Sequence, residues 1–168
     1  MHRILPPTDT ERLFDVAQTR AIEHAATASL PPHTLMRRAG LACARLALAV
    51  APHAGRVWIA AGPGNNGGDG LEAALHLAQG GKQVEVSLIG DVAALPTDAK
   101  QACERAQAAG VHIDSGPIAP RVPPDLALDA LSYATLVGTL RGSSDTAIAA
   151  HAERIANAPV TYQGRSEE

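Results

Sequence analysis

The sequence predicts an α/β domain with an open, mostly parallel sheet that is covered by helices on both faces. Two helical patterns come first, and short apolar runs then alternate with amphipathic segments. Such alternation is typical of parallel sheets, because each parallel pair of strands needs a crossover connection. The chain has 168 residues, of which 46% are hydrophobic, so we expect a single domain over residues 1–168 with a sizeable core.

The first helix is indicated by its start. We expect residues 1–13 to form an arm that precedes it. Asp15 and Gln18 then have the spacing of a capping box, in which each side chain binds a free backbone amide. A helix should follow and continue to about Ala28.

A second helix is expected between two proline breaks. Pro31 and Pro32 interrupt the chain, Thr34 can cap the helix, and Pro52 ends it. Gly40 costs helix stability by roughly 1 kcal/mol relative to alanine, so we expect it to mark close packing against a neighbour. The apolar spacing predicts a buried face made of Leu35, Ala39, Cys43, Leu46 and Val50.

Short apolar runs after this helix are expected to be buried strands of the sheet. Glycines end the helices between them, as glycine commonly does. In chain order, we expect strands over residues 57–61, 84–89, 111–113 and 126–131, with helices over residues 70–79 and 97–109. A further helix over 145–157 and a fifth strand that begins within 159–162 complete the pattern.

Composition argues against several classes of function. A formal net charge of -3 provides no general basic field for nucleic acid, and the aromatic residues are too few for a base-stacking platform. The histidines form no zinc pattern, and Cys43 and Cys103 are expected to be buried free thiols. No apolar stretch of the sequence has membrane-spanning length, and no signal-peptide pattern is present, so we expect a cytoplasmic protein with no membrane partner.

The stretch GPGNNGGDG, residues 62–70, follows the first expected strand. Ligands bind at the carboxyl ends of the strands in such sheets, and three explanations compete for the stretch. Gly62, Gly64 and Gly67 satisfy the dinucleotide pattern G-x-G-x-x-G, but a carboxylate at Asp69 would repel a pyrophosphate there. A P-loop would need a lysine that this stretch lacks. A plain glycine turn with Asp69 as the cap of the next helix leaves the asparagines unexplained.

The polar residues of this stretch limit the kinds of ligand that it can bind. Asn65 and Asn66 offer amide groups, and Asp69 offers charge. Together they suit ribose hydroxyls, an amide, or a hard cation that bridges protein oxygens and a phosphate. The sequence therefore indicates a nucleotide bound differently from the dinucleotide pattern. A Rossmann dehydrogenase stays open as a weaker alternative, although the sequence offers no second domain for its substrate.

Three motifs resemble those of the NAD(P)H-hydrate epimerase family, the YjeF N-terminal domain. They are HTLMRRAG at 33–40, GPGNNGGDG at 62–70 and LALDAL at 126–131, and the resemblance covers roughly residues 14–160. It implies a Rossmann-like three-layer α/β/α sandwich with a mostly parallel central sheet. It also implies an isomerase that interconverts the R and S epimers of hydrated NADH and NADPH, a repair reaction. A homodimer and a functional link to an NAD(P)H-hydrate dehydratase are further implications.

The resemblance also assigns site residues at matching positions. Asn66 and Asp129 would bind a potassium ion. The substrate would contact Asn65, Asn66, Gly67, Gly68 and Asp69, and, from the later stretch VGTLRG, Gly138, Thr139 and Arg141. Asp129 is our candidate for the catalytic acid or base, because it ends an apolar strand at the binding edge of the sheet.

The end of the chain departs from the family pattern. Asp129 is followed by ALSYATLVGTLRG, where the family has its glycine-rich stretch sooner. After NAPV the family continues into Val-Asp-x-Pro-Ser-Gly, whereas this chain reads TYQGRSEE. We therefore expect residues 161–168 to be an atypical tail of a truncated or degenerate copy, with impaired activity. A non-catalytic nucleotide-binding or dimerisation module of the same fold is the main alternative function.

Overall fold

The computed structural model describes residues 14–115 and 120–131. Within these described residues, four strands form one parallel sheet in the order β3-β2-β1-β4. Their bounds, each within one residue of the prediction, are β1 Arg56–Ala61, β2 Gln83–Leu88, β3 His112–Asp114 and β4 Leu126–Ala130. The expected arm, the helix over 145–157, the fifth strand and the tail lie outside the described residues.

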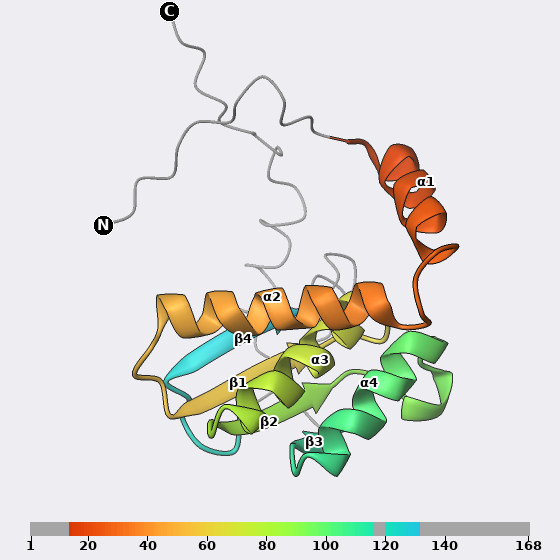
Figure 1. Ribbon diagram of the computed structural model, residues 1–168. Helices are drawn as coiled ribbons and strands as arrows, with labels where there is room; N and C mark the ends of the chain where they lie inside the picture. Colours follow the sequence, from red (N-terminus) through yellow and green to blue (C-terminus); the bar gives the residue numbers. More distant parts are fainter. Residues whose placement is uncertain (1–13, 116–119, 132–168) are drawn as a thin grey trace, which may run out of the picture.

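In the part of the chain that the structure describes, four α-helices accompany the sheet: α1 Val16–Thr27, α2 Thr34–Val50, α3 Asn65–Gln79 and α4 Thr97–Ala108. Helix α3 lies on the sheet, α2 and α4 pack against α3, and α1 stands apart beyond the start of α2 (Figure 1). A short 3-10 helix, Val92–Ala94, follows β2 and is capped by the side chain of Asp91. The Rossmann-like α/β fold class is thus confirmed.

Each strand presents alternate residues to the two faces of the sheet. Val57, Ile59 and Ala61 of β1 are buried and belong to the core beneath the helices. On the other face the Trp58 indole donates a hydrogen bond to the Ser87 hydroxyl at 2.9 Å. The segment before β4 contacts this same face, because the Arg121 side chain forms ion pairs with β2 and β3 through Glu85 at 3.6 Å and Asp114 at 3.1 Å. The two faces of the sheet are therefore chemically different, one apolar and the other partly polar.

The capping box of α1 is confirmed in both directions. The Gln18 amide donates to the Asp15 carboxylate at 2.8 Å, and the Asp15 amide donates to the Gln18 side chain at 3.0 Å. The cap of α2 differs from the prediction by one residue. Thr34 begins that helix, its hydroxyl donates to the Pro31 carbonyl at 2.7 Å, and His33 occupies the cap position with a φ of 65°.

The predicted buried face of α2 is wrong. Leu46 and Val50 are 65% and 70% exposed, and Cys43 is exposed as well, which also corrects the expectation of two buried thiols. The buried residues are instead Met36, Gly40, Ala44 and Ala47. Small side chains let α2 approach α3 closely, and this approach outweighs the greater hydrophobicity of the neighbouring stripe. A Cβ at Gly40 would collide with the side chain of Glu72, so the expected close packing at this glycine is confirmed.

Close packing requires glycine at several positions of the 62–70 stretch. None of them has a positive φ. A Cβ at Gly67 would collide with the Gly62 carbonyl, and a Cβ at Gly70 would lie 2.5 Å from the Ala130 Cβ. A Cβ at Gly68 would lie 2.9 Å from the Ala99 Cβ and still closer to Met36. The start of α3 is therefore held against β4, α2 and α4 with no space for side chains.

Helix α3 also begins earlier than predicted. It starts at Asn65, and Gly64 is its cap residue. Asp69 lies in its second turn, so the expected capping role of Asp69 is wrong. The glycines lower the intrinsic helix propensity of this stretch, but the tight contacts at Gly67, Gly68 and Gly70 fix it as helix.

A buried charge pair links α3 to α4. Glu72 is 1% exposed, and its carboxylate lies 2.6 Å from the Arg105 guanidinium and 3.7 Å from the His76 imidazole. A buried carboxylate without a partner is strongly unfavourable. Arg105 therefore stabilises the packing of α4 on α3 by compensating this charge.

We expect Gly67→Ala to lower the free energy of unfolding by about 3 kcal/mol, because the new methyl group meets backbone that cannot move aside. The measurement is urea unfolding followed by circular dichroism. Gly64→Ala is the matched control, since a Cβ there meets nothing within 4 Å. Equal effects of the two substitutions would contradict the packing explanation.

We expect Arg105→Met to lower the free energy of unfolding by about 3 kcal/mol, the lower end of the range for breaking a buried pair, since Arg105 is itself 33% exposed. Adding Glu72→Gln to this variant should restore part of the loss, because the uncompensated charge is then removed. Arg38→Met, at an exposed position of α2, serves as the control. A double variant no more stable than Arg105→Met alone would refute the charge argument.

Candidate functional site

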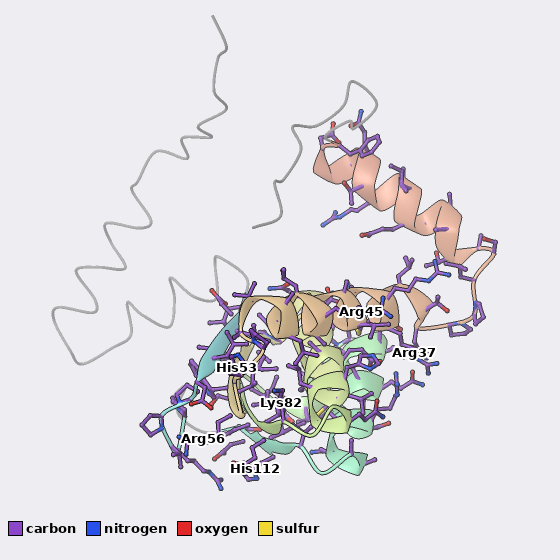
Figure 2. All side chains as sticks on the ribbon, turned by 60° about the vertical axis from the view of Figure 1, so that its left-hand side comes forward. Arg37, Arg45, His53, Arg56, Lys82 and His112 are labelled. Carbon is purple, nitrogen blue, oxygen red and sulfur yellow. The ribbon has the colours of Figure 1, made fainter. Side chains whose placement is uncertain are left out.

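The candidate site lies where the chain passes from β1 into α3, at the carboxyl ends of the strands (Figure 1). The basic side chains labelled in Figure 2 lie elsewhere. Arg37 and Arg45 are on α2, whereas His53, Arg56, Lys82 and His112 lie at or just before the amino ends of the strands. These six basic side chains are thus not gathered around the glycine stretch.

Asn66 and Asp129 are brought together at this edge. Strand β4 lies beside β1, with Asp129 in register with Ala60. The Asn66 side-chain amide donates to the Leu131 carbonyl at 2.9 Å, and the Leu131 amide donates to the Asp129 carboxylate at 2.8 Å. Both side chains are thus fixed by the backbone of one residue just after β4. Asp129 is exposed, so a ligand can reach it.

The donors at this point suit a hard cation. Asn66 and Asp129 provide amide and carboxylate oxygens, the ligands that hard cations prefer. Over residues 14–115 and 120–131, His, Cys, Asp and Glu form no group of three or more that could hold a metal ion. Oxygen donors such as those of Asn66 and Asp129 suit hard cations rather than soft transition metals.

Asn65 and Asp69 face a different space from Asn66. They line a cavity of about 600 Å³ between α1 and the starts of α2 and α3. Residues four apart share one face of a helix, which places Asn65 and Asp69 together, while Asn66 points about a quarter of a turn away, toward β4. Gly67 and Gly68 are buried, so any ligand contact of theirs is through the backbone.

The cavity shifts the titration of Asp69. Burial and, to a smaller extent, the nearby Glu23 carboxylate of α1 together raise the pKa of Asp69 from 3.8 to about 6. A carboxyl group of this pKa changes its protonation state near neutral pH, as general acids and bases do.

A second polar pair lines the same cavity. His33 Nδ1 lies 2.7 Å from the Asp98 carboxylate, which links the start of α2 to α4. A left-handed backbone is uncommon for a residue other than glycine, and His33 adopts it at the cavity wall. Sequence reasoning missed His33, Asp98 and Glu23, because their relation depends on where α1 and α4 lie relative to α3. The unusual His-Thr start of α2 was the only local signal.

Three predicted substrate contacts come from a later part of the chain. Gly138, Thr139 and Arg141 lie outside the described residues.

Among the helices that the structure describes, none is long and apolar enough to cross a membrane.

A parallel sheet with a glycine-rich helix start and an acidic strand end at its carboxyl edge is typical of Rossmann-like α/β proteins, which bind ligands at that edge. The family model of the YjeF-related protein N-terminus matches residues 32–161. The chain therefore belongs to this family, which confirms the resemblance.

Several relatives support the same family. An NAD(P)H-hydrate epimerase of Bordetella pertussis (strain Tohama I) is 39% identical over 135 residues, which are 80% of this chain and 56% of that protein. One of Rhodopirellula baltica is 36% identical over 109 residues, covering 65% and 43% of the two chains. The bifunctional NAD(P)H-hydrate repair enzyme Nnr of Coxiella burnetii is 34% identical over 139 residues, covering 82% and 28%. The chain thus spans about half the length, or less, of these relatives.

A solved structure supports the fold. The crystal structure of yeast ynu0 (YNL200c) matches with a TM-score of 0.53 at 21% identity, over 77% of this chain and 51% of that one. At this identity the match shows a shared fold.

We expect Asp69→Asn to stabilise the protein at pH 7. The folded state holds the Asp69 proton up to about pH 6, whereas the unfolded chain releases it near its ordinary value of 3.8. Ionisation therefore lowers stability as pH rises through this window. We expect the gain to be on the order of 1 kcal/mol, discounted for solvent screening because Asp69 is half-buried.

The measurement is urea unfolding at about pH 3.5, 5 and 7, values that span the pH window between the two pKa values of Asp69. The gain from Asp69→Asn should shrink to nothing at the lowest pH. Glu104→Gln, at an exposed position of α4, is the control. A gain of the same size at every pH would reject the titration of Asp69 as its cause.

Proposed function

We propose that the chain interconverts the R and S epimers of hydrated NADH and NADPH. Membership of the YjeF-related family and the relatives named NAD(P)H-hydrate epimerase support this activity. The observation that carries it is the linkage of Asn66 and Asp129 through the backbone of Leu131. The linkage supports the proposal because it holds a carboxyl group, which can act as an acid or base, close to an amide at the edge where Rossmann-like proteins bind ligands.

The reaction needs a bond at C6 of the hydrated nicotinamide ring to be broken and formed again. The ring nitrogen supplies electrons that expel the hydroxyl group or open the ring, and re-addition from the other side gives the other epimer. In this proposal Asp129 donates a proton to the departing oxygen and accepts one when the bond forms again. Such acid-base assistance contributes typically about 10² to 10⁴-fold in rate.

The proposal includes a potassium ion held by Asn66 and Asp129, whose oxygen donors fit such an ion. When bound, the ion would supply positive charge that attracts the oxygens of the substrate. Asn66 keeps its side chain oriented through its bond to Leu131. Asn65, Gly67, Gly68 and Asp69 would contact the substrate from the first turns of α3, and Gly138, Thr139 and Arg141 from the later part of the chain.

Three further expectations accompany this activity. Relatives named bifunctional NAD(P)H-hydrate repair enzyme occur in Coxiella burnetii and Thermofilum pendens, which supports a functional link between the epimerase and an NAD(P)H-hydrate dehydratase. We also keep a homodimer and a cytoplasmic location as predictions.

The test is an epimer-interconversion assay that starts from the pure R epimer. We expect Asp129→Ala to lower kcat by about 10² to 10⁴-fold, because the acid or base is lost. Asn66→Ala should abolish the dependence of the rate on potassium, measured against choline as the replacement cation. Glu104→Gln should leave the rate unchanged.

Unchanged rates in both the Asp129→Ala and the Asn66→Ala variant would reject the site. A wild-type chain that binds reduced nicotinamide nucleotides but turns over neither epimer would instead favour a non-catalytic module of the same fold.

A further inference from the structure

Asp125 links the start of β4 to the start of β1, at the edge of the sheet opposite the candidate site. Its carboxylate oxygen Oδ2 accepts hydrogen bonds from the Arg56 amide at 2.8 Å and from the Gly55 amide at 2.9 Å. Its own amide donates to the Arg56 carbonyl at 2.9 Å. Three hydrogen bonds of one residue thus join the two strands at the edge where Figure 2 labels Arg56.

The side chain of Asp125 makes these bonds as a carboxylate. The hydrogen bonds from the Arg56 and Gly55 amides lower the pKa of Asp125 below its ordinary value of 3.8, so the group is ionised near neutral pH. Bonds from a backbone amide to a carboxylate are shorter and stronger than bonds between neutral groups. Asp125 therefore holds the amino end of the β1–β4 pair more firmly than the strand ladder alone.

The register of β4 matters at its other end. In the observed register Asp129 lies beside Ala60 of β1. A shift of β4 by one residue would turn the Asp129 side chain to the other face of the sheet. A shift by two residues would move it by about 7 Å, since each residue of a strand rises about 3.3 Å. Either shift would separate Asp129 and the Leu131 backbone from Asn66.

The core contacts of β4 oppose such a shift mainly in one direction. Leu126 and Leu128 both pack against the core, two residues apart. A shift toward the carboxyl edge would bring Leu128 to the position of Ala130, where even a Cβ at Gly70 would lie 2.5 Å from the Ala130 Cβ. A shift toward the amino edge would instead put the smaller Ala130 where Leu128 packs, which creates no clash there. The bonds of Asp125 oppose this second shift, because it would break them.

We propose that Asp125 is a positioning residue for the site: it sets the register of β4 and thereby holds Asp129 and the Leu131 backbone next to Asn66. The inference rests on the proposed function, in which Asp129 is the acid or base. The effect extends over about 13 Å, because four strand residues separate the two aspartates. One aspartate carries out the chemistry, and the other, at the opposite edge, keeps it in place.

Nuclear magnetic resonance of the whole chain tests the positioning without any turnover. Asp125→Ala removes the accepting oxygen, so the side-chain amide resonances of Asn66 should shift. The Gly62 amide, which donates to the Ala130 carbonyl at 3.1 Å, should exchange with solvent at least about tenfold faster. Asp125→Asn keeps an oxygen that can accept both bonds and should resemble the wild type in both signals. A role confined to the amino edge would change only the amides at the start of β1.

Turnover of the R epimer gives the second readout. Asp125→Ala should lower kcat by about 10 to 100-fold and change KM less than about twofold, because a small displacement of the acid or base slows the chemistry while α3 still contacts the substrate. Asp125→Asn should recover most of kcat. Val111→Ala removes buried apolar atoms beside β3, at the far side of the sheet. It controls for a general loss of stability and should leave kcat unchanged.

The proposal is overturned if Asp125→Ala leaves the Asn66 and Gly62 signals as in the wild type, or if an active chain keeps its kcat in this variant. Should Asp125→Ala not fold by circular dichroism, Asp125→Glu replaces it. The extra methylene displaces the carboxylate but keeps its charge, so Asn66 resonances at wild-type positions would again refute the positioning role. A wild-type chain that turns over neither epimer refutes the proposed function, and the resonance test of Asp125 still decides this inference.

Discussion

The site depends on the close packing of the glycines at the start of α3. Gly67, Gly68 and Gly70 each lie where a Cβ would meet a neighbouring atom. Because the start of α3 is pressed against β4, α2 and α4 at once, its direction and rotation are fixed. Packing at the glycines therefore positions the backbone of Asn65, Asn66 and Asp69, and the bond from Asn66 to Leu131 then orients the Asn66 side chain.

The orientation of α3 about its own axis points different residues of the helix at different neighbours. Asn66 and Gly70 share the side toward β4, where they meet Leu131 and Ala130. Asn65 and Asp69 share the side toward α1 and its cavity, and Gly68 and Glu72 share the side toward α2 and α4. Residues four apart lie on one face of a helix. Consecutive residues of the 62–70 stretch therefore contact different neighbouring elements. The unfavourable burial of Asp69 near Glu23 is the kind of cost that proteins retain at ligand sites.

Much of this architecture can be predicted from sequence, and the errors have physical causes. The strands follow from short apolar runs between turn residues, and the α1 cap follows from Asp15 and Gln18. The predicted start of α3 was too late, because glycine has a low helix propensity, whereas tight packing holds this stretch in a helix. The buried face of α2 was misassigned because Leu46 and Val50 suggest burial, whereas close approach selects Gly40 and Ala44. The proximity of Asp129 to Asn66 could be predicted from strand order, but the cavity could not, because it depends on how α1 is placed.

The indole of Trp58 gives the molecule an internal optical probe. It is the sole tryptophan of the chain, and its N–H bond to Ser87 spans β1 and β2. Indole emission responds to the polarity and hydrogen bonding around the ring. Intrinsic fluorescence therefore monitors the pairing of the two central strands from the face opposite the helices, with no label attached. Changes confined to the neighbourhood of α1 should leave this signal silent, so loosening of the sheet can be told apart from rearrangement at the ligand edge.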